Sequence, residues 1–345
     1  MSDPGRQLMP VLRLAPAKVN LTLAVLGRRP DGFHDLHSVF VPLELADRLS
    51  LAPGGSSGED SLHVEGPDTG PLADNLVLRG IAAARAAIGA GPGRPATPAL
   101  AARLEKHIPV AAGLGGGSSD GAAAFDGALE AWGAGGGAEG ALDEDRRRRA
   151  AASIGSDVPF FLGAGSIAAA GAALVEGRGE RVLPVVGITG QPGILLITPR
   201  VAVRTPDVFA VFAGTQVSGD GSVRMTSEHL AQELTNGLSS DGLIARAGVL
   251  AVANDLLAAA GLVAPGLIAV RRALMRVLKR PVGLSGSGPT LWTLYPSRTE
   301  AESAATVVRA AIADGAIPSI GDGPPAVIVS TIRAGRRPAH EEVSP

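Results

Sequence analysis

Four glycines are concentrated in one short stretch of this 345-residue chain, Ile108–Asp120, which reads IPVAAGLGGGSSD. A strand-like segment, Leu100–Lys106, precedes it, and a segment of helical composition, Ser118–Trp132, follows it. Glycine lets the backbone take left-handed turns and approach a ligand closely. Successive amide groups can then surround an anion at the positive end of a helix. The stretch is therefore predicted to be a phosphate-binding loop, with a flexible structural loop as the alternative.

The stretch differs from two common nucleotide-binding loops. A Walker A loop requires a lysine after its last glycine, where this chain has Ser118. The dinucleotide fingerprint GxGxxG belongs to the first βαβ unit and expects an acidic residue about 20 positions later, at a strand end. Neither pattern fits, so the loop belongs to another class of phosphate site.

The rest of the chain predicts an α+β fold. Leu12–Leu26 and Val39–Leu51 are rich in branched apolar residues at near-alternate spacing, which is typical of strands. A short buried strand is expected at Gly193–Thr198 and another strand at Ala326–Thr331. Helices are expected at Asn75–Ile88, capped by Asp74, through most of Ser227–Lys279, and at Arg298–Ala313. A hairpin with a Gly-Arg-Gly turn is expected within Ile167–Val182, and a second glycine cluster lies between strand-like segments in Val282–Tyr295. Hairpins and helices without a regular βα alternation indicate α+β rather than a doubly wound sheet.

Length and charge narrow the class of protein. A chain of 345 residues suits two domains, placed here at residues 1–185 and 186–345, the second with a polar tail from Arg336. With 31 basic and 33 acidic residues, the chain lacks the positive charge expected of a nucleic-acid-binding protein. It has no signal-peptide pattern and no apolar run near the about 20 residues that span a bilayer, which predicts a cytoplasmic protein without a membrane partner.

Metal and anion sites elsewhere in the chain have weak support. The chain has no cysteine, and five of its histidines are spread without ligand spacing: His37, His63, His107, His229 and His340. The run Asp143–Arg149 (DEDRRRR) is either an anion site or a solvated helix face, and the second interpretation is favoured.

Two charged residues are candidates for chemistry beside the loop. Phosphoryl transfer needs positive charge near the transferred group and a residue that orients or deprotonates the acceptor. Lys18 lies in an apolar strand (PAKVN), and Asp157 lies in a tight apolar segment (GSDVPFFLG). Either residue alone is more often structural. Together they could form a charge pair beside the phosphates, with Asp157 accepting a hydroxyl proton and Lys18 neutralising developing charge.

Four segments carry a family resemblance. PAKVNLTL (Pro16–Leu23), IPVAAGLGGGSSDGAAAF (Ile108–Phe125), GSDVPFFLG (from Gly155) and LSGSGPT (Leu284–Thr290) resemble, in this order, motifs of the GHMP kinase superfamily. The superfamily includes galactokinases, homoserine kinases and mevalonate kinases. The resemblance implies a two-domain GHMP kinase fold with the active site in the interdomain cleft. It also implies ATP as phosphate donor, with Mg²⁺ travelling on the ATP.

The segment Arg28–Phe40 (RRPDGFHDLHSVF) and the triple glycine resemble one branch of that superfamily. The branch phosphorylates the 2-hydroxyl of a small-molecule substrate, a cytidine diphosphate sugar alcohol, in the non-mevalonate isoprenoid pathway. Two alternatives stay open: another GHMP kinase of the homoserine or mevalonate type, and a non-catalytic nucleotide-binding or RNA-binding module.

The resemblance assigns site residues by position. The catalytic base is Asp157, and its partner is Lys18. The nucleotide-binding residues are Pro109, Val110, Ala111, Ala112, Gly113, Leu114, Gly115, Gly116, Gly117, Ser118 and Ser119, with Asn75 and Lys106 near the adenine. The substrate-binding residues are Asn20, Phe33, His34, Thr205, Phe209, Ser285, Gly286, Ser287 and Gly288.

The resemblance gives further detail at a few positions. Phe33 stands where the family usually has tyrosine, which keeps the aromatic face and removes a hydroxyl. Phe209, in RTPDVF, is expected to stack on the other side of the cytosine, and His34 to hydrogen-bond the base. Asp255 has either a substrate role or a role at a helix terminus. For Mg²⁺, the protein supplies Ser119 or no ligand.

Overall fold

The computed structural model describes residues 10–54, 58–89, 97–134, 142–162, 171–214 and 221–334. It divides into two compact units, each built from separate parts of the chain. Unit 1 holds Met1–Ala17, Ala46–Val110 and Gly115–Ser166, and unit 2 holds Lys18–Leu45, Ala111–Leu114 and Ile167–Pro345. Strands β1 (Val11–Asn20) and β3 (His34–Pro53) each have residues in both units. The division into domains 1–185 and 186–345 stays a prediction.

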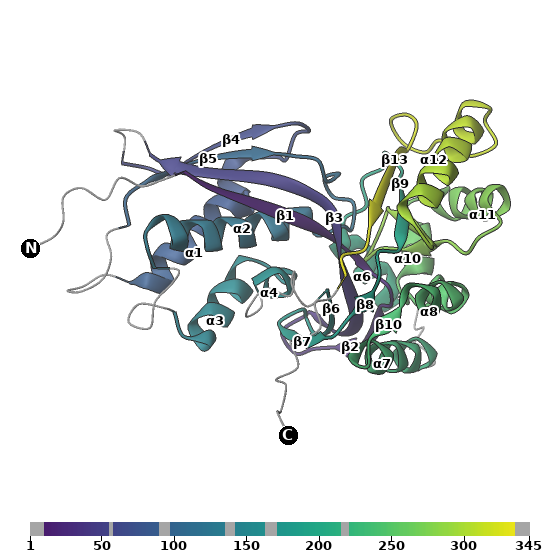
Figure 1. The fold of residues 1–345 in the computed structure, drawn as a ribbon, viewed down its shortest axis with the longest axis horizontal. Coiled ribbons are helices and arrows are strands. Elements are labelled where there is room, and N and C mark those ends of the chain that lie inside the picture. Colours follow the sequence, from purple (N-terminus) through teal and green to yellow (C-terminus); the bar gives the residue numbers. More distant parts are fainter. Residues whose placement is uncertain are drawn as a thin grey trace, which may run out of the picture. The chain divides into compact units, whose positions relative to one another are not determined.

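Unit 1 packs helices against a sheet. Strand β5 (Leu100–Glu105) pairs in parallel with β4 (Ser61–Glu65) and antiparallel with the second half of β3, and β1 also pairs with β3. Its helices are the 3₁₀ turn η1 (Leu72–Asp74), α1 (Leu76–Ile88), α2 (Gly116–Ala131), α3 (Glu144–Ile154) and α4 (Val158–Leu162). Figure 1 shows α1 and α2 lying along one face of these strands.

Small residues let α1 and α2 pack closely. A Cβ placed on Gly80 of α1 would clash with the backbone carbonyl of Gly121 in α2. The buried face of α2 is largely alanine, and Phe125 is its one buried large aromatic side chain among the described residues. Close helix packing through glycine and alanine explains how a chain with only 3% aromatic residues builds a dense core.

The described residues of unit 2 contain three sets of paired strands. The first half of β3 pairs antiparallel with β2 (Ala24–Arg28) and with β6 (Ala172–Gly177), and β6 pairs with β7 (Arg181–Val185). Two short strands, β8 (Ile188–Thr189) and β10 (Leu238–Ser239), pair in parallel. An antiparallel sheet has the order β11 (Gly283–Leu284), β12 (Leu291–Tyr295), β9 (Gly193–Thr198), β13 (Ala326–Thr331).

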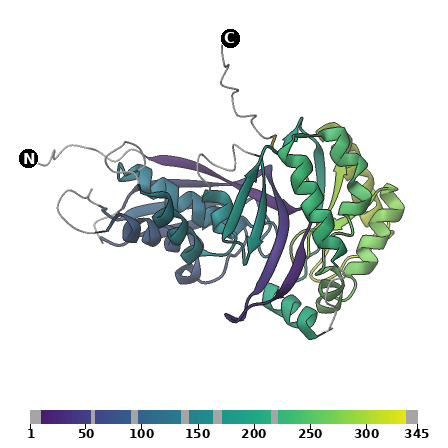
Figure 2. The same cartoon turned by 90° about the horizontal axis from the view of Figure 1, so that it is seen from below.

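Helices of unit 2 bury the second core. They are α6 (Thr205–Gly214), α7 (Ser222–Thr235), α8 (Ser240–Ala245), α9 (Ala247–Leu250), α10 (Leu257–Val263), α11 (Leu267–Leu278) and α12 (Arg298–Ala313). Figure 2 shows the green helices of this unit gathered beside its strands. Strand β9 is buried along its whole length, because β12 and β13 flank it within the sheet and α12 packs on it.

The α+β class predicted from the sequence is confirmed, and two local predictions are wrong. The N-cap of α1 is Asn75, whose side chain accepts a hydrogen bond from the Val77 amide, whereas Asp74 lies in the preceding 3₁₀ turn. Helix α2 begins at Gly116 rather than Ser118. The predicted polar tail from Arg336 lies outside the described residues.

None of the described helices alone is long and apolar enough to cross a bilayer. One bent pair, α10 with α11, reaches the threshold by length and composition only, and the angle between the two helices is 119°.

Candidate functional site

The N-terminus of α2 lies within the predicted phosphate loop. Gly115 precedes the helix with a φ of 69°, a left-handed conformation that glycine adopts without strain. The Ser119 amide donates the first intrahelical bond, to the Gly115 carbonyl at 2.9 Å. The amides of the residues between these two have no intrahelical acceptor, and the first turn contains no acidic side chain. This helix end is therefore suited to bind an anion.

Two other predicted segments of unit 1 lie beside this helix end. A Cβ on Gly117 would lie 3.8 Å from the side chain of Leu76, the residue that directly follows Asn75. A Cβ on Gly155 would lie 3.7 Å from the Ser118 hydroxyl. Asp157 follows two residues later, half-buried, directly before α4. The fold thus brings the Asn75, glycine-loop and GSD segments together.

Lys106 lies in a buried ionic cluster beside the loop. Its ammonium group lies 2.7 Å from a carboxylate oxygen of Asp120 and also pairs with Asp47. All three side chains are almost fully buried. The other carboxylate oxygen of Asp47 accepts a hydrogen bond from the Ile108 amide at 2.8 Å. The cluster therefore connects the start of the glycine loop to the helix that follows it, and Lys106, expected near the adenine, has two carboxylate partners within the protein.

The cluster changes the titration of its members. Burial raises the pKa of Asp120 to about 7; the Lys106 charge opposes this shift and the Asp47 charge adds to it. Burial lowers the pKa of Lys106, but the charges of Asp120 and Asp47 outweigh burial, and the net shift is upward. Within the described part of the chain, the Ser119 hydroxyl and one Asp120 carboxylate oxygen are buried without a hydrogen-bond partner.

Lys18 and Asn20 form a buried pair in unit 2. The Lys18 ammonium donates to the Asn20 side-chain oxygen at 2.7 Å and lies 4.6 Å from the ring centroid of Phe40. Asn20 in turn donates to the Ser38 hydroxyl at 3.0 Å. The Lys18 amide donates to the Leu114 carbonyl at 2.9 Å. These bonds fix both predicted site residues on one face of β1, next to residues 111–114 of the loop.

The two glycine clusters meet within unit 2. The Ser285 hydroxyl donates to the Gly113 carbonyl at 2.9 Å. A Cβ on Gly113 would clash with the Ser285 carbonyl oxygen and lie 3.0 Å from that of Gly288. The hydroxyl of Ser287 lies 2.9 Å from that of Thr205, the first residue of α6. Residues predicted separately to bind nucleotide and substrate are therefore neighbours here.

Sequence reasoning missed Asn254, which organises the second glycine cluster. Its side-chain amide donates to the carbonyls of Leu284 and Gly286, at 3.0 and 2.9 Å. Asp255, for which two roles were open, accepts a hydrogen bond from the Val25 amide at 2.9 Å. The one sequence signal was an asparagine beside Asp255 in a largely apolar segment, AVANDL, and that signal does not say which backbone groups the asparagine binds.

The aromatic residues predicted to hold a base are partly in contact. The rings of His34 and Phe209 are stacked, with centroids 4.9 Å apart and an interplanar angle of 22°. Phe33 is 49% exposed, and the Arg178 guanidinium lies 5.3 Å from its ring centroid. Burial and the nearby Arg28 charge lower the pKa of His34. A neutral imidazole offers both a donor and an acceptor to a ligand.

The run Asp143–Arg149 forms a helix face, the favoured interpretation. Asp143 caps α3 by accepting a hydrogen bond from the Arg146 amide at 2.7 Å. Arg147 pairs with Asp126, and Arg148 with Asp145.

As for metals, the described residues contain no group of three or more His, Cys, Asp or Glu side chains that could hold an ion.

Similarity to known proteins agrees with these features. A family model described as the GHMP kinases N terminal domain matches residues 75–165. A 4-diphosphocytidyl-2-C-methyl-D-erythritol kinase from a strain of Methylorubrum extorquens is 38% identical over 306 residues, which is 86% of this chain and 94% of the relative. One of the same name from Pelotomaculum thermopropionicum is 35% identical over 301 residues, 87% of this chain and 94% of the relative.

Solved structures agree at the level of the fold. A crystal structure of 4-(cytidine 5'-diphospho)-2C-methyl-D-erythritol kinase superposes with a TM-score of 0.66 at 30% identity, covering 94% of this chain and all of the other. A homoserine kinase from Cytophaga hutchinsonii superposes with a TM-score of 0.63 at 16% identity, covering 97% and 98% of the two chains. The second likeness supports the two-domain GHMP kinase fold alone.

Proposed function

Since the chain belongs to the 4-diphosphocytidyl-2-C-methyl-D-erythritol kinase family of GHMP kinases, we propose that it transfers a phosphate from ATP to the 2-hydroxyl of 4-diphosphocytidyl-2-C-methyl-D-erythritol. The products would be the 2-phosphate and ADP. The reaction belongs to the non-mevalonate pathway of isoprenoid precursors, as the sequence resemblance implied.

One structural observation carries the proposal. The N-terminus of α2 lies beside the turn that holds Asp157, because the Gly155 backbone approaches the Ser118 hydroxyl. A helix N-terminus suits a phosphate group. A carboxylate a few residues away suits a group that accepts the proton of an acceptor hydroxyl. In unit 1, the proposed phosphate site and the candidate base are therefore neighbours, an arrangement that suits a phosphoryl transferase.

Unit 2 supplies the other proposed catalytic residue. Lys18 would orient the acceptor hydroxyl and neutralise charge that develops on the transferred phosphate. Its ammonium is held by Asn20, so it is preorganised before the substrate binds. Asn20 would also help to hold the substrate. Joint action of Lys18 and Asp157 stays a proposal.

The base of the substrate would be recognised by aromatic and imidazole groups of unit 2. The stack of Phe209 on His34 fixes the imidazole plane, and a neutral His34 can both donate to and accept from a cytosine edge. Phe33, with an exposed ring, would pack against the base. Thr205 and the Ser285–Gly288 segment would contact the rest of the substrate.

ATP is the phosphate donor that a kinase of this family implies, and Mg²⁺ is part of the proposal. Among the described residues, Ser119 fits as its protein ligand, because a hydroxyl is a hard oxygen donor and this one is buried without a hydrogen-bond partner. The ion would neutralise phosphate charge during transfer. A cytoplasmic location stays a prediction.

The test is a choice of acceptors. The purified full chain is given ATP, Mg²⁺ and, in separate reactions, 4-diphosphocytidyl-2-C-methyl-D-erythritol, homoserine and mevalonate, and ADP release is measured. We expect turnover with the cytidine compound only, and phosphorus NMR of the product should place the new phosphate on the 2-hydroxyl. Turnover restricted to homoserine or mevalonate would overturn the substrate assignment, and ATP binding without any turnover would favour a non-catalytic module.

A further inference from the structure

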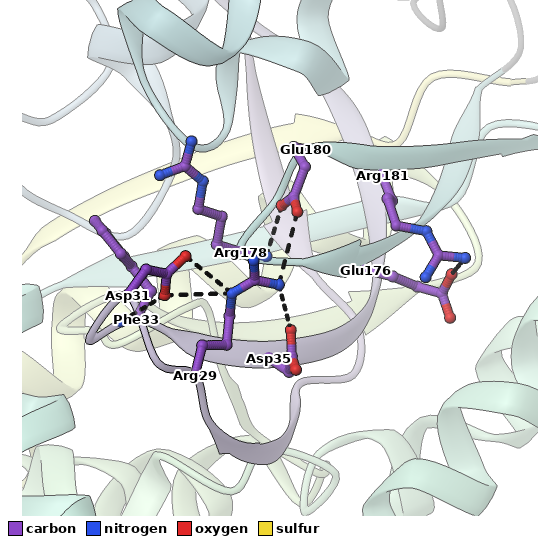
Figure 3. Close-up of polar contacts among 8 residues, drawn as sticks. All are labelled: Arg29, Asp31, Phe33, Asp35, Glu176, Arg178, Glu180 and Arg181. Carbon is purple, nitrogen blue, oxygen red and sulfur yellow. Dashed lines mark hydrogen bonds and ion pairs between the residues drawn. The ribbon is translucent and has the colours of Figure 1, made fainter.

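Two turns of unit 2 are joined by one shared guanidinium (Figure 3). Arg29 lies between β2 and β3, and its guanidinium lies 3.1 Å from Asp31 and 2.8 Å from Asp35. It also lies 3.9 Å from Glu180, in the turn between β6 and β7. Because the guanidinium contacts carboxylates of both turns, it holds them side by side.

The same carboxylates fix the backbone at two neighbouring positions. Asp31 accepts a hydrogen bond from the Phe33 amide at 3.2 Å. Glu180 accepts one from the Arg178 amide at 2.7 Å. The backbone positions of Phe33 and Arg178 are therefore set by the pairing around Arg29.

The side chain of Arg178 takes no part in that pairing. Its guanidinium lies 5.3 Å from the centroid of the Phe33 ring, and Figure 3 shows it pointing away from Arg29 and Glu180. Arg181, on the same hairpin, pairs with Glu176 at 3.0 Å. Within the part of the chain that the structure describes, Arg178 forms no ion pair with a carboxylate.

A guanidinium in this setting is prepared to bind an anion. The aromatic ring orients its plane and excludes water from one side. Its charge acts on Asp31 but forms no ion pair there, so its N–H donors stay available to a ligand. Its planar donors fit two oxygens of one phosphate group. A diphosphate offers such oxygens, whereas a neutral base offers the guanidinium no anionic acceptor.

We propose that Arg178 binds the diphosphate group of the nucleoside diphosphate substrate whose base packs against Phe33 and His34. This inference rests on the proposed function, and it assigns to Arg178 the charged part of the substrate. Arg29 then acts as a positioning residue, since it fixes both turns without contacting the ligand.

The first test compares ligands with and without phosphates. Binding of cytidine 5'-diphosphate and of cytidine to the full chain is measured by calorimetry for the wild type, Arg178→Met and Arg181→Met. We expect Arg178→Met to weaken the binding of cytidine 5'-diphosphate by about 10- to 100-fold, because a charge-assisted contact is lost. The affinity for cytidine should stay within about 2-fold of the wild type. Arg181→Met removes the same charge from the same hairpin and should change neither ligand by more than about 2-fold.

The second test uses kinetics with the cytidine substrate. Arg178→Met should raise its KM by a similar factor and leave kcat and the KM of ATP unchanged, and Arg178→Lys should fall between the two. Equal weakening of cytidine and cytidine 5'-diphosphate, or an equal effect of Arg181→Met, would overturn the proposal. If the wild type does not phosphorylate the cytidine substrate, the proposed function fails; if it does, and Arg178→Met has the wild-type KM, only this inference fails.

Discussion

The Lys106 ammonium lies 2.7 Å from the Asp120 carboxylate and also pairs with Asp47, so one buried cation faces two buried carboxylates. Two negative charges against one positive charge in a desolvated site are unfavourable, and a proton retained on one carboxyl group relieves the imbalance. Burial is the main cause that raises the pKa of Asp120 to about 7, and the Asp47 charge adds to it while the Lys106 charge opposes it. The site links the two ends of the glycine loop, so its charge state bears on the stability of the loop.

Asp120→Asn should change how stability depends on pH. An aspartate in the unfolded chain has a pKa of about 3.9, and Asp120 in the folded chain has one of about 7. Between these values the folded state binds the proton more tightly, so this group's contribution to the free energy of unfolding falls as pH rises through the window and is constant above it. We expect urea unfolding to show the wild type losing stability relative to Asp120→Asn from about pH 4.5 to about pH 7.5. A pH-independent difference would contradict the raised pKa.

Lys106→Met should be strongly destabilising, because it leaves Asp47 and Asp120 buried without their cation. Removal of one partner of a buried pair costs about 3–5 kcal/mol. Arg103→Met, in β5 three residues before Lys106, is the matched control: its pair with Glu65 is largely exposed and should contribute about 0–1 kcal/mol. Chemical unfolding near neutral pH measures the free energy of unfolding of both variants. Equal losses would mean that the buried cluster stabilises the protein no more than an exposed ion pair does.

Gly113→Ala should destabilise the protein through the backbone. Gly113 has a φ of 75°, where an L-residue is disfavoured by about 1–2 kcal/mol, and the new Cβ would also clash with the Ser285 carbonyl. Gly248→Ala in α9 is the control, since its Cβ would meet no heavy atom within 4 Å. The control should unfold within about 1 kcal/mol of the wild type. Unfolding free energies of both variants decide the point, and a neutral Gly113→Ala would mean that the two glycine clusters are not in firm contact.

The KM of the cytidine substrate should depend on His34 below neutral pH. The pKa of His34 lies below its usual value of about 6.5, so the imidazole is neutral at about pH 6.5 and above. As pH falls through the lowered pKa, the ring gains a proton, loses its acceptor, and the KM should rise. His34→Asn should have a higher KM that is flat over the same range. The KM of ATP serves as the internal control, and a parallel rise in both KM values would assign the effect to another group.

Asp157→Asn should lower turnover by about 100- to 10,000-fold, the usual range for loss of a general base. Asparagine cannot accept the proton, which is why turnover should fall. Because it has nearly the same shape as aspartate, calorimetry should show ATP binding within about 2-fold of the wild type. Single-turnover kinetics with the cytidine substrate measures the chemical step directly. Wild-type turnover in this variant would remove Asp157 from the mechanism.

Much of the secondary structure could be predicted from local patterns. The predicted bounds of β9, α12 and β13 coincide with the observed ones, because short runs of branched apolar residues and a helical pattern with clear ends define them. The start of α1 was predicted wrongly because Asp74 and Asn75 are both good caps, and only the 3₁₀ turn before them selects Asn75. A choice between adjacent caps depends on how the chain enters the helix.

The candidate site was predictable in its motifs but not in its contacts. Glycine density marked the loop and the second cluster, whereas the bond from Ser285 to Gly113 joins residues 172 positions apart. Asn254 and Asp47 were missed for the same reason, since each acts on backbone or charge that is distant in sequence. The two acidic partners of Lys106 also could not be inferred, because burial of a lysine beside carboxylates depends on how β3, β5 and α2 pack.

The close packing of α1 and α2 at Gly80 and Gly121 limits which segments of a relative can replace parts of unit 1. A segment corresponding to α1 taken from a relative would fit only if it brought an equally small residue to the crossing point. A larger residue would push α2 aside and displace the glycine loop at its N-terminus. The two helices are therefore exchangeable as a pair and not singly, and a chimaera with a junction between them is expected to lose nucleotide binding before it loses its fold.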